Sequence, residues 1–237
     1  MGQWLQFDTP SGRIGAWQTD PTGPVRGGLV VIQEIFGVNA HMRAVADGYA
    51  AEGYAVLAPA FFDPIERGVE LDYSEAGFAR GRELVGALGL AAATGIVAAA
   101  ADWLRAHLAA WQAALAVGSV GYCWGGSVAL LAALRLGLPS VSYYGARNVQ
   151  AMDALDAESP AFLQQPKAPV MFHFGQDDAS IPEAAIASHR TRLPTMLQFV
   201  YPAGHAFNRD VDPRAWHPDS AHLARRRSLA FFEEHLA

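Results

Sequence analysis

The stretch Gly121-Tyr122-Cys123-Trp124-Gly125-Gly126 decides the fold that this sequence predicts. Residues 114–120 before it form an apolar run that is typical of a buried strand, and residues 127–134 after it have the composition of a helix. Glycine on both sides of Cys123 allows a sharp, strained turn that pushes the cysteine side chain outward. The first N–H groups of the new helix would face that side chain and favour a thiolate. The pattern therefore predicts that Cys123 is a nucleophile.

A second interpretation of Cys123, the only cysteine in the chain, is structural. Free cysteine is among the residue types most often buried, where it packs as a small apolar side chain. The glycine spacing and the strand-to-helix context favour the nucleophile instead. A single cysteine forms no internal disulfide, which fits a reducing compartment.

Strand and helix patterns alternate on both sides of this turn. Short runs at residues 4–8 and 13–19 flank a Pro/Gly turn and predict a hairpin, whereas residues 60–73 and 145–167 are expected to be mostly loop. Further strands are expected at residues 28–33, 54–58, 140–144, 169–174 and 197–201, and further helices at residues 39–52, 74–88, 91–108, 181–192 and 219–236. Asn39 and Ser74 are expected to cap the first two of these helices. The order predicts one α/β domain over residues 1–237, a doubly wound, mostly parallel sheet with helices on both faces and an N-terminal hairpin.

Composition and charge narrow the class of protein. The chain has 237 residues, about half of them apolar, and a formal net charge of −6, which argues against nucleic acid as a partner. The N-terminus lacks the basic and apolar regions of a signal peptide. Residues 88–101 are expected to be too short and too weakly apolar to span a bilayer. We expect a soluble cytoplasmic protein without a membrane partner.

A thiol needs a base to activate it and a group to orient that base. His205 stands in a Gly-flanked loop just after a predicted strand, and Asp177 and Asp178 follow the preceding strand. Loops at the carboxyl ends of parallel strands converge, so His205 is the expected base and either aspartate could orient it. Among the eight histidines, His173 is expected to be a satisfied core group, and His217 has no expected role. Those in predicted helices are expected at the surface: His41, His107, His189, His222 and His235.

Glu34 is a carboxylate in the apolar segment Gln33-Glu34-Ile35-Phe36-Gly37, at the end of the first buried strand. Such a group is costly unless it is paired. Glu34 could turn outward or bond a nearby N–H group. Alternatively, it could be a partner of Cys123, on a loop that donates a backbone N–H to an oxyanion.

Four motifs in this order resemble the dienelactone hydrolase family: Q-E-I-F-G at residues 33–37, G-Y-C-W-G-G at 121–126, G-x-x-D at 175–178 and A-G-H-A-F at 203–207. The likeness extends over most of the chain, from about residue 4 to residue 235. Members of this family have the α/β-hydrolase fold and hydrolyse a lactone formed during chloroaromatic and catechol breakdown. The resemblance implies the same fold and a hydrolase of this class.

The resemblance also implies roles for individual residues. It implies a triad of Cys123, His205 and Asp178, because the family aspartate closes the G-x-x-D motif. It implies that Glu34 holds the resting thiol and helps to deprotonate it when substrate enters. The backbone N–H groups of Trp124 and Ile35 would form the oxyanion hole.

Two arginines hold the substrate carboxylate in the family enzyme. Arg209, four residues after His205, matches one of them, although it could also be a solvated loop charge. Arg80 and Arg82 lie in the segment expected to supply the other, but neither falls cleanly at the family position.

The prediction is a monomeric hydrolase that cleaves a small lactone or carboxylic ester through an acyl-enzyme on Cys123, without cofactor or metal. One alternative is a metal-dependent hydrolase using His173, Asp177, Asp178 and His205, which lack the usual ligand spacing. Another is a catalytically weak family member that binds lactones or senses oxidants through Cys123.

Overall fold

A computed structural model describes residues 2–111 and 115–236 of the chain. It divides into two compact units, Met1–Ser119 with His235–Ala237, and Val120–Glu234. Strand β5 (Val117–Tyr122) begins in the first unit and ends in the second. The units are described in turn.

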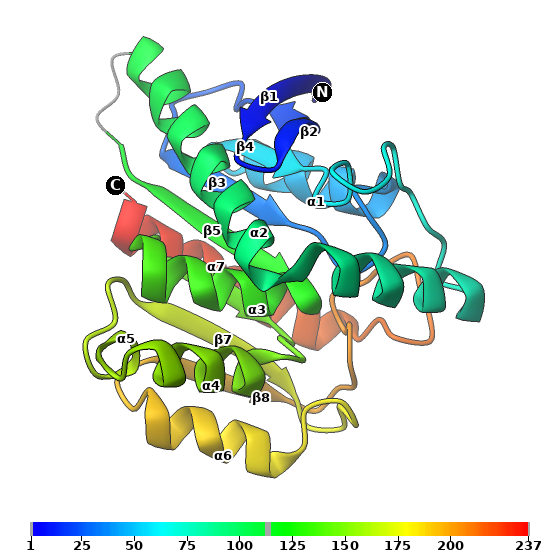
Figure 1. The fold of residues 1–237 in the computed structure, drawn as a ribbon, viewed down its shortest axis with the longest axis vertical. Helices are drawn as coiled ribbons and strands as arrows, with labels where there is room; N and C mark the ends of the chain where they lie inside the picture. Colours follow the sequence, from blue (N-terminus) through cyan, green and yellow to red (C-terminus); the bar gives the residue numbers. More distant parts are fainter. Residues whose placement is uncertain (1, 112–114, 237) are drawn as a thin grey trace. The chain divides into compact units, whose positions relative to one another are not determined.

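The first unit contains the predicted N-terminal hairpin, formed by β1 (Gln3–Thr9) and β2 (Gly12–Thr19), which pair antiparallel (Figure 1). Strand β4 (Tyr54–Pro59) pairs antiparallel with β2 and parallel with β3 (Gly27–Ile32). The order β1-β2-β4-β3-β5 places the hairpin at the edge of this part of the sheet. Every residue of β3 and β4 is buried, as their continuous apolar sequences predict.

Two helices accompany these strands. Helix α1 (Ala40–Ala51) begins after Asn39, whose side chain accepts a hydrogen bond from the Met42 backbone N–H, so the predicted cap is confirmed. Helix α2 (Glu75–Ala110) begins after Ser74, which caps it through the Gly77 N–H. The two helices predicted at residues 74–88 and 91–108 meet at one non-helical residue, Gly89, with φ 73°.

Helix α2 contradicts the expectation that the apolar segment at residues 88–101 is too short and too weakly apolar to span a bilayer. It is 36 residues long and contains an 18-residue window of mean hydropathy 2.0, which is long and apolar enough to cross a membrane by length and composition. The expectation considered only residues 88–101 and missed the flanking helical turns. Core helices of soluble proteins have the same properties, and one face of α2, including Ile96, Val97 and Leu104, is buried.

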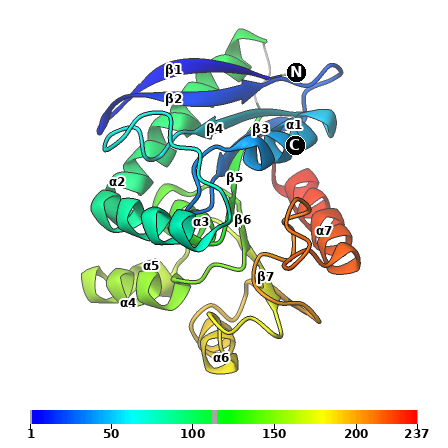
Figure 2. The ribbon, with the colours of Figure 1, turned by 90° about the vertical axis from the view of Figure 1, so that its right-hand side faces the viewer.

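The strands of the second unit follow the end of β5 in the order β6-β7-β8, with β6 (Ser140–Tyr143), β7 (Val170–Gly175) and β8 (Leu197–Tyr201). Strands β6, β7 and β8 pair parallel, so their carboxyl ends meet at one edge. Helices α4 and α7 lie on opposite sides of these strands (Figure 2). The helices of this unit are α3 (Trp124–Leu131), a π-helical turn (Ala132–Leu136), α4 (Asn148–Glu158), α5 (Ala161–Gln164), α6 (Glu183–Arg192) and α7 (Pro218–Leu236).

The expectation of a loop over residues 145–167 was wrong, because α4 and α5 lie there. Ala151, Met152 and Leu155 recur at helical spacing and are fully buried. Pro160 does not interrupt a helix but precedes the first residue of α5, where a missing N–H costs little.

Candidate active site

Cys123 lies between β5 and α3 in a backbone conformation that few residues adopt. Its φ is 55° and its ψ is −119°, a strained combination for a residue with a side chain. A Cβ at Gly121 would lie 1.9 Å from the carbonyl oxygen of Gly125. A Cβ at Gly126 would lie 2.8 Å from the Tyr143 carbonyl oxygen. The turn closes only because these two residues are glycine.

Hydrogen bonds hold this turn in place. The Cys123 backbone N–H donates to the Tyr143 carbonyl at 3.0 Å, and the Cys123 carbonyl accepts from the Gly126 N–H at 2.9 Å. The Cys123 side chain is half-buried and hydrogen-bonds the imidazole of His205. Trp124 is the first residue of α3, so its N–H belongs to the positive end of the helix dipole beside the thiol.

His205 lies in the loop that follows β8. Its Nδ1 donates a hydrogen bond to Asp178 Oδ2 at 2.6 Å, which leaves Nε2 as the ring nitrogen for Cys123. The next residue, Ala206, has φ 60°, and the ring of Tyr144 packs edge-on against the imidazole at 5.1 Å. The imidazole therefore contacts Asp178, Cys123 and Tyr144. The His205 side chain is 29% exposed.

The structure distinguishes the two adjacent aspartates. Asp178 is 3% exposed and contacts His205, whereas Asp177 is exposed and its backbone N–H donates to the Ala203 carbonyl. The two loops approach so closely that a Cβ at Gly175 would lie 2.4 Å from the Ala203 carbonyl oxygen. Asp178 is thus the carboxylate that the fold brings to His205.

The Ser180 side chain joins the cluster formed by Cys123, His205 and Asp178. This residue was not predicted from the sequence. Its hydroxyl lies 2.5 Å from Asp178 Oδ1 and 3.1 Å from His205 Nδ1, and its backbone N–H donates to the same Oδ1 at 2.9 Å. Serine two residues after aspartate is typical of a turn. That pattern could have pointed to the contact with Asp178 but not to the contact with His205.

Charges within the cluster shift the pKa values of both partners. Burial opposes a charge on His205, yet the Coulombic interaction with Cys123 and the hydrogen bonds with Asp178 and Cys123 raise the pKa of His205 to about 10. Burial would raise the pKa of Asp178, but the hydrogen bond and charge of His205, together with Ser180, hold it below its ordinary value. The raised pKa of His205 and the lowered pKa of Asp178 favour an imidazolium beside a carboxylate.

The other histidines lie elsewhere. His173 is the expected core group: it is fully buried between Tyr201 and Ser228, and burial and the charge of Arg227 lower its pKa to about 3. The surface expectation was wrong for His41 and His189, which are 7% and 0% exposed, because both stand on the inner face of their helices. His222 is exposed, His107 pairs with Asp20, and His217 accepts from the Ser220 N–H.

Arg209, the predicted carboxylate contact, is 7% exposed and lies 3.4 Å from Asp212. It is therefore not a solvated loop charge. Asp212 also pairs with Arg214, and this hydrogen bond, more than that of Arg209, lowers the pKa of Asp212.

The remaining predicted residues belong to the first unit. Glu34 and Ile35 are 1% and 5% exposed, in the segment after β3. Arg80 pairs with Glu66 and Glu83, and the Arg82 guanidinium lies over the Phe78 ring. Over residues 2–111 and 115–236, no three His, Cys, Asp or Glu side chains are grouped as metal ligands.

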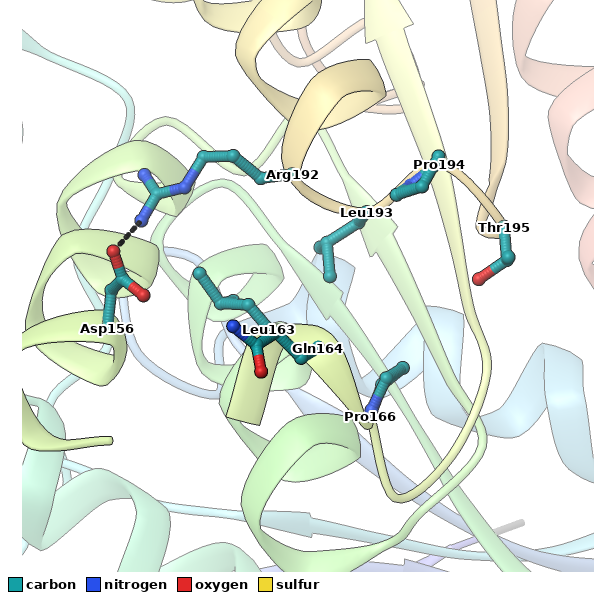
Figure 3. Close-up of a pocket in the computed structure, with 8 residues that line it drawn as sticks. All are labelled: Asp156, Leu163, Gln164, Pro166, Arg192, Leu193, Pro194 and Thr195. Carbon is teal, nitrogen blue, oxygen red and sulfur yellow. Dashed lines mark ion pairs between the residues drawn. The ribbon is translucent and has the colours of Figure 1, made fainter. Parts of the chain in front are cut away.

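A pocket of about 410 Å³ lies in the second unit away from this cluster (Figure 3). Pro166 precedes β7 and Pro194 precedes β8, so the pocket opens at the amino ends of strands whose carboxyl ends carry Asp178 and His205. Its Arg192 forms ion pairs with Asp153 at 2.6 Å and Asp156 at 3.9 Å.

Comparisons with known proteins match this chain over most of its length. The model of the dienelactone hydrolase family matches residues 14–236. A Yersinia pestis protein classed as a carboxymethylenebutenolidase is 32% identical over 235 residues, which cover 87% of this chain and 78% of the relative. Carboxymethylenebutenolidase 1 of Cupriavidus pinatubonensis is 30% identical over 210 residues, covering 85% and 84%. A crystal structure of a Klebsiella pneumoniae protein classed as a dienelactone hydrolase has a TM-score of 0.83 at 26% identity, covering 99% of each chain.

Proposed function

Because the chain belongs to the dienelactone hydrolase family and has the α/β-hydrolase fold, we propose that it hydrolyses a small lactone or carboxylic ester through a covalent intermediate on Cys123. The observation that carries this proposal is the line of contacts from the Cys123 side chain through the His205 imidazole to the Asp178 carboxylate. A nucleophile, its base and the group that orients the base are the three elements that such acyl transfer requires.

The proposed reaction begins with attack of the Cys123 thiolate on the substrate carbonyl carbon. The tetrahedral intermediate collapses, the bond to the alkoxy oxygen breaks, and His205 gives that oxygen a proton. A water molecule then loses a proton to His205 and attacks the thioester, which releases the carboxylic acid and restores the thiolate. Asp178 keeps Nδ1 protonated throughout, so that Nε2 exchanges the proton.

Two further parts of the proposal come from the resemblance. The backbone N–H of Trp124, at the start of α3, and that of Ile35 would stabilise the oxyanion, each by roughly 3 kcal/mol in the transition state. Glu34 would hold the resting thiol and assist its deprotonation. The kinetics of Glu34→Gln test this role separately from the triad.

The relatives' names point to the substrate class. Carboxymethylenebutenolidases act on a lactone that bears a carboxylate, and we propose a lactone of this kind as substrate, with Arg209 as its contact. Arg209 is 7% exposed and lies 3.4 Å from Asp212, which would hold its guanidinium in one position for a planar contact with the substrate carboxylate.

Cys123→Ala is the direct test of the mechanism. We expect the variant to fold, because the turn depends on Gly121 and Gly126, and to lose all hydrolysis of lactones and activated esters. In the wild type, an activated ester should give a burst of product and a mass increase that maps to Cys123. Hydrolysis by Cys123→Ala at the wild-type rate would exclude the proposal, and absence of turnover in both proteins would favour a binding or sensing role.

A further inference from the structure

Each oxygen of the Asp178 carboxylate has its own partner. Oδ2 faces His205 Nδ1, whereas Oδ1 accepts from both the hydroxyl and the backbone N–H of Ser180. The carboxylate side chain is fully buried, while Ser180 is exposed. Ser180 therefore lies between the buried carboxylate and solvent.

The Ser180 hydroxyl also reaches the imidazole. Once it donates its proton to Oδ1, its oxygen remains an acceptor, 3.1 Å from His205 Nδ1. The Nδ1 proton is thus shared mainly with Oδ2 and partly with the Ser180 oxygen. A serine that only shaped the turn would need its backbone N–H alone, because that group already bonds Oδ1.

We propose that Ser180 is a positioning residue of the catalytic cluster, which fixes the rotation of the Asp178 carboxylate so that Oδ2 faces His205. This inference rests on the proposed function of the same cluster. Without the hydroxyl, Oδ1 of the carboxylate keeps the hydrogen bond from the Ser180 N–H. The carboxylate gains freedom to rotate about the Cβ–Cγ bond of Asp178. Water could then bond Oδ1 in place of the hydroxyl, and the carboxylate would be less firmly held with Oδ2 facing His205 Nδ1.

Kinetics of a matched set of variants test the proposal. The set contains Ser180→Ala, Ser180→Thr, which keeps the hydroxyl, and Ser188→Ala on α6 as a control, each in the wild-type and Asp178→Asn backgrounds. Ser180→Ala should lower kcat about tenfold, as for loss of a hydrogen bond to a charged group, and change KM by less than about twofold. Ser180→Thr should restore most of kcat, and Ser188→Ala should have no effect.

The Asp178→Asn background separates positioning from general damage. There, Ser180→Ala should change kcat by less than about twofold, because the carboxylate that it orients is absent. An equal loss in both backgrounds, or no loss in Ser180→Ala, would overturn the proposal.

A spectroscopic measurement separates this proposal from the proposed function. The low-field proton NMR signal of His205 Nδ1–H should be present in the wild type and Ser180→Thr, and should weaken and move upfield in Ser180→Ala. This outcome supports Ser180 even if the wild type hydrolyses no tested ester, which would contradict the proposed function alone. An unchanged signal in Ser180→Ala overturns the role of Ser180 alone.

Discussion

Asp177 and Asp178 are neighbours in sequence with opposite environments. Asp178 is buried with an oxygen 2.6 Å from His205, whereas Asp177 is exposed. A buried carboxylate beside an imidazole selects the tautomer and stabilises the imidazolium, which an amide cannot do. An exposed carboxylate in a loop contributes little to the choice of tautomer or to the stability of the imidazolium.

Asp178→Asn should therefore lower kcat by about 10³–10⁴-fold, and Asp177→Asn should stay within about twofold of the wild type. The measurement is kcat on one activated ester for both variants, with near-ultraviolet circular dichroism as the check on folding. If the larger loss belonged to Asp177→Asn, the assignment of the orienting carboxylate would be wrong.

His205 has a titration that depends on Cys123. Burial opposes the pKa of about 10, which owes most to the Coulombic interaction with a negatively charged Cys123, followed by the hydrogen bond that His205 donates to Asp178. Removing that negative charge removes a cause that raises the pKa, so the pKa must fall.

In an NMR titration, the His205 ring of the wild type should lose its proton near pH 10, and that of Cys123→Ala should lose it at a lower pH. His173 is an internal reference, because its pKa of about 3 keeps it neutral across this range. Identical midpoints for His205 in the two proteins would show that no thiolate–imidazolium pair forms.

At the scale of elements, the turn between β5 and α3 depends on backbone atoms that approach one another closely. The position of Gly121 is tightest, since the atoms nearest to an added Cβ, at 1.9 and 2.3 Å, are the carbonyl oxygen and carbon of Gly125. Backbone atoms cannot move aside as the end of a flexible side chain can. The start of α3, and with it the N–H of Trp124, would have to shift.

Gly121→Ala should destabilise the protein by about 3 kcal/mol or more and abolish hydrolysis. Gly86→Ala is the matched control, because Gly86 is an exposed position of α2 where an added Cβ would have no atom within 4 Å beyond the local backbone of its own helix. There, alanine should stabilise by up to about 1 kcal/mol. Unfolding in urea measures both, and equal stability of the two variants would contradict the steric argument.

At the scale of the whole molecule, the formal net charge of −6 works against binding of an anion. A local positive charge must compensate if the substrate carries a carboxylate. Arg209 is the proposed source of that charge, and a planar guanidinium suits a carboxylate. It has no part in the proposed attack of the Cys123 thiolate, so substrate specificity and the chemical step should respond to different substitutions.

Arg209→Ala should lower kcat/KM for a carboxylate-bearing lactone about ten- to 150-fold relative to its methyl ester, the loss of a hydrogen bond to a charged group. The ratio of the two kcat/KM values in wild type and variant is the measurement. The methyl ester controls for any damage from removing a buried group. A ratio that does not move would mean that Arg209 is not a substrate contact.

Much of the local structure follows from the sequence alone. Apolar runs predicted the strands, Asn39 and Ser74 predicted helix starts, and the glycines around Cys123 predicted the strained turn, because each depends on atoms a few residues apart. The helix over residues 148–158 was missed, although its apolar spacing was present, because nearby prolines suggested a loop.

Other features depend on tertiary packing. Asp178 and His205 lie 27 residues apart, and their contact requires the parallel pairing of β7 with β8. The burial of His189 depends on the packing of α6 against β7, because its ring lies against Phe172 and Phe174 of β7. The sequence by itself determined the strained turn at Cys123 and the family. Only the tertiary structure decided which aspartate meets His205 and that Ser180 joins them, because these contacts are set by the distance between loops on different strands.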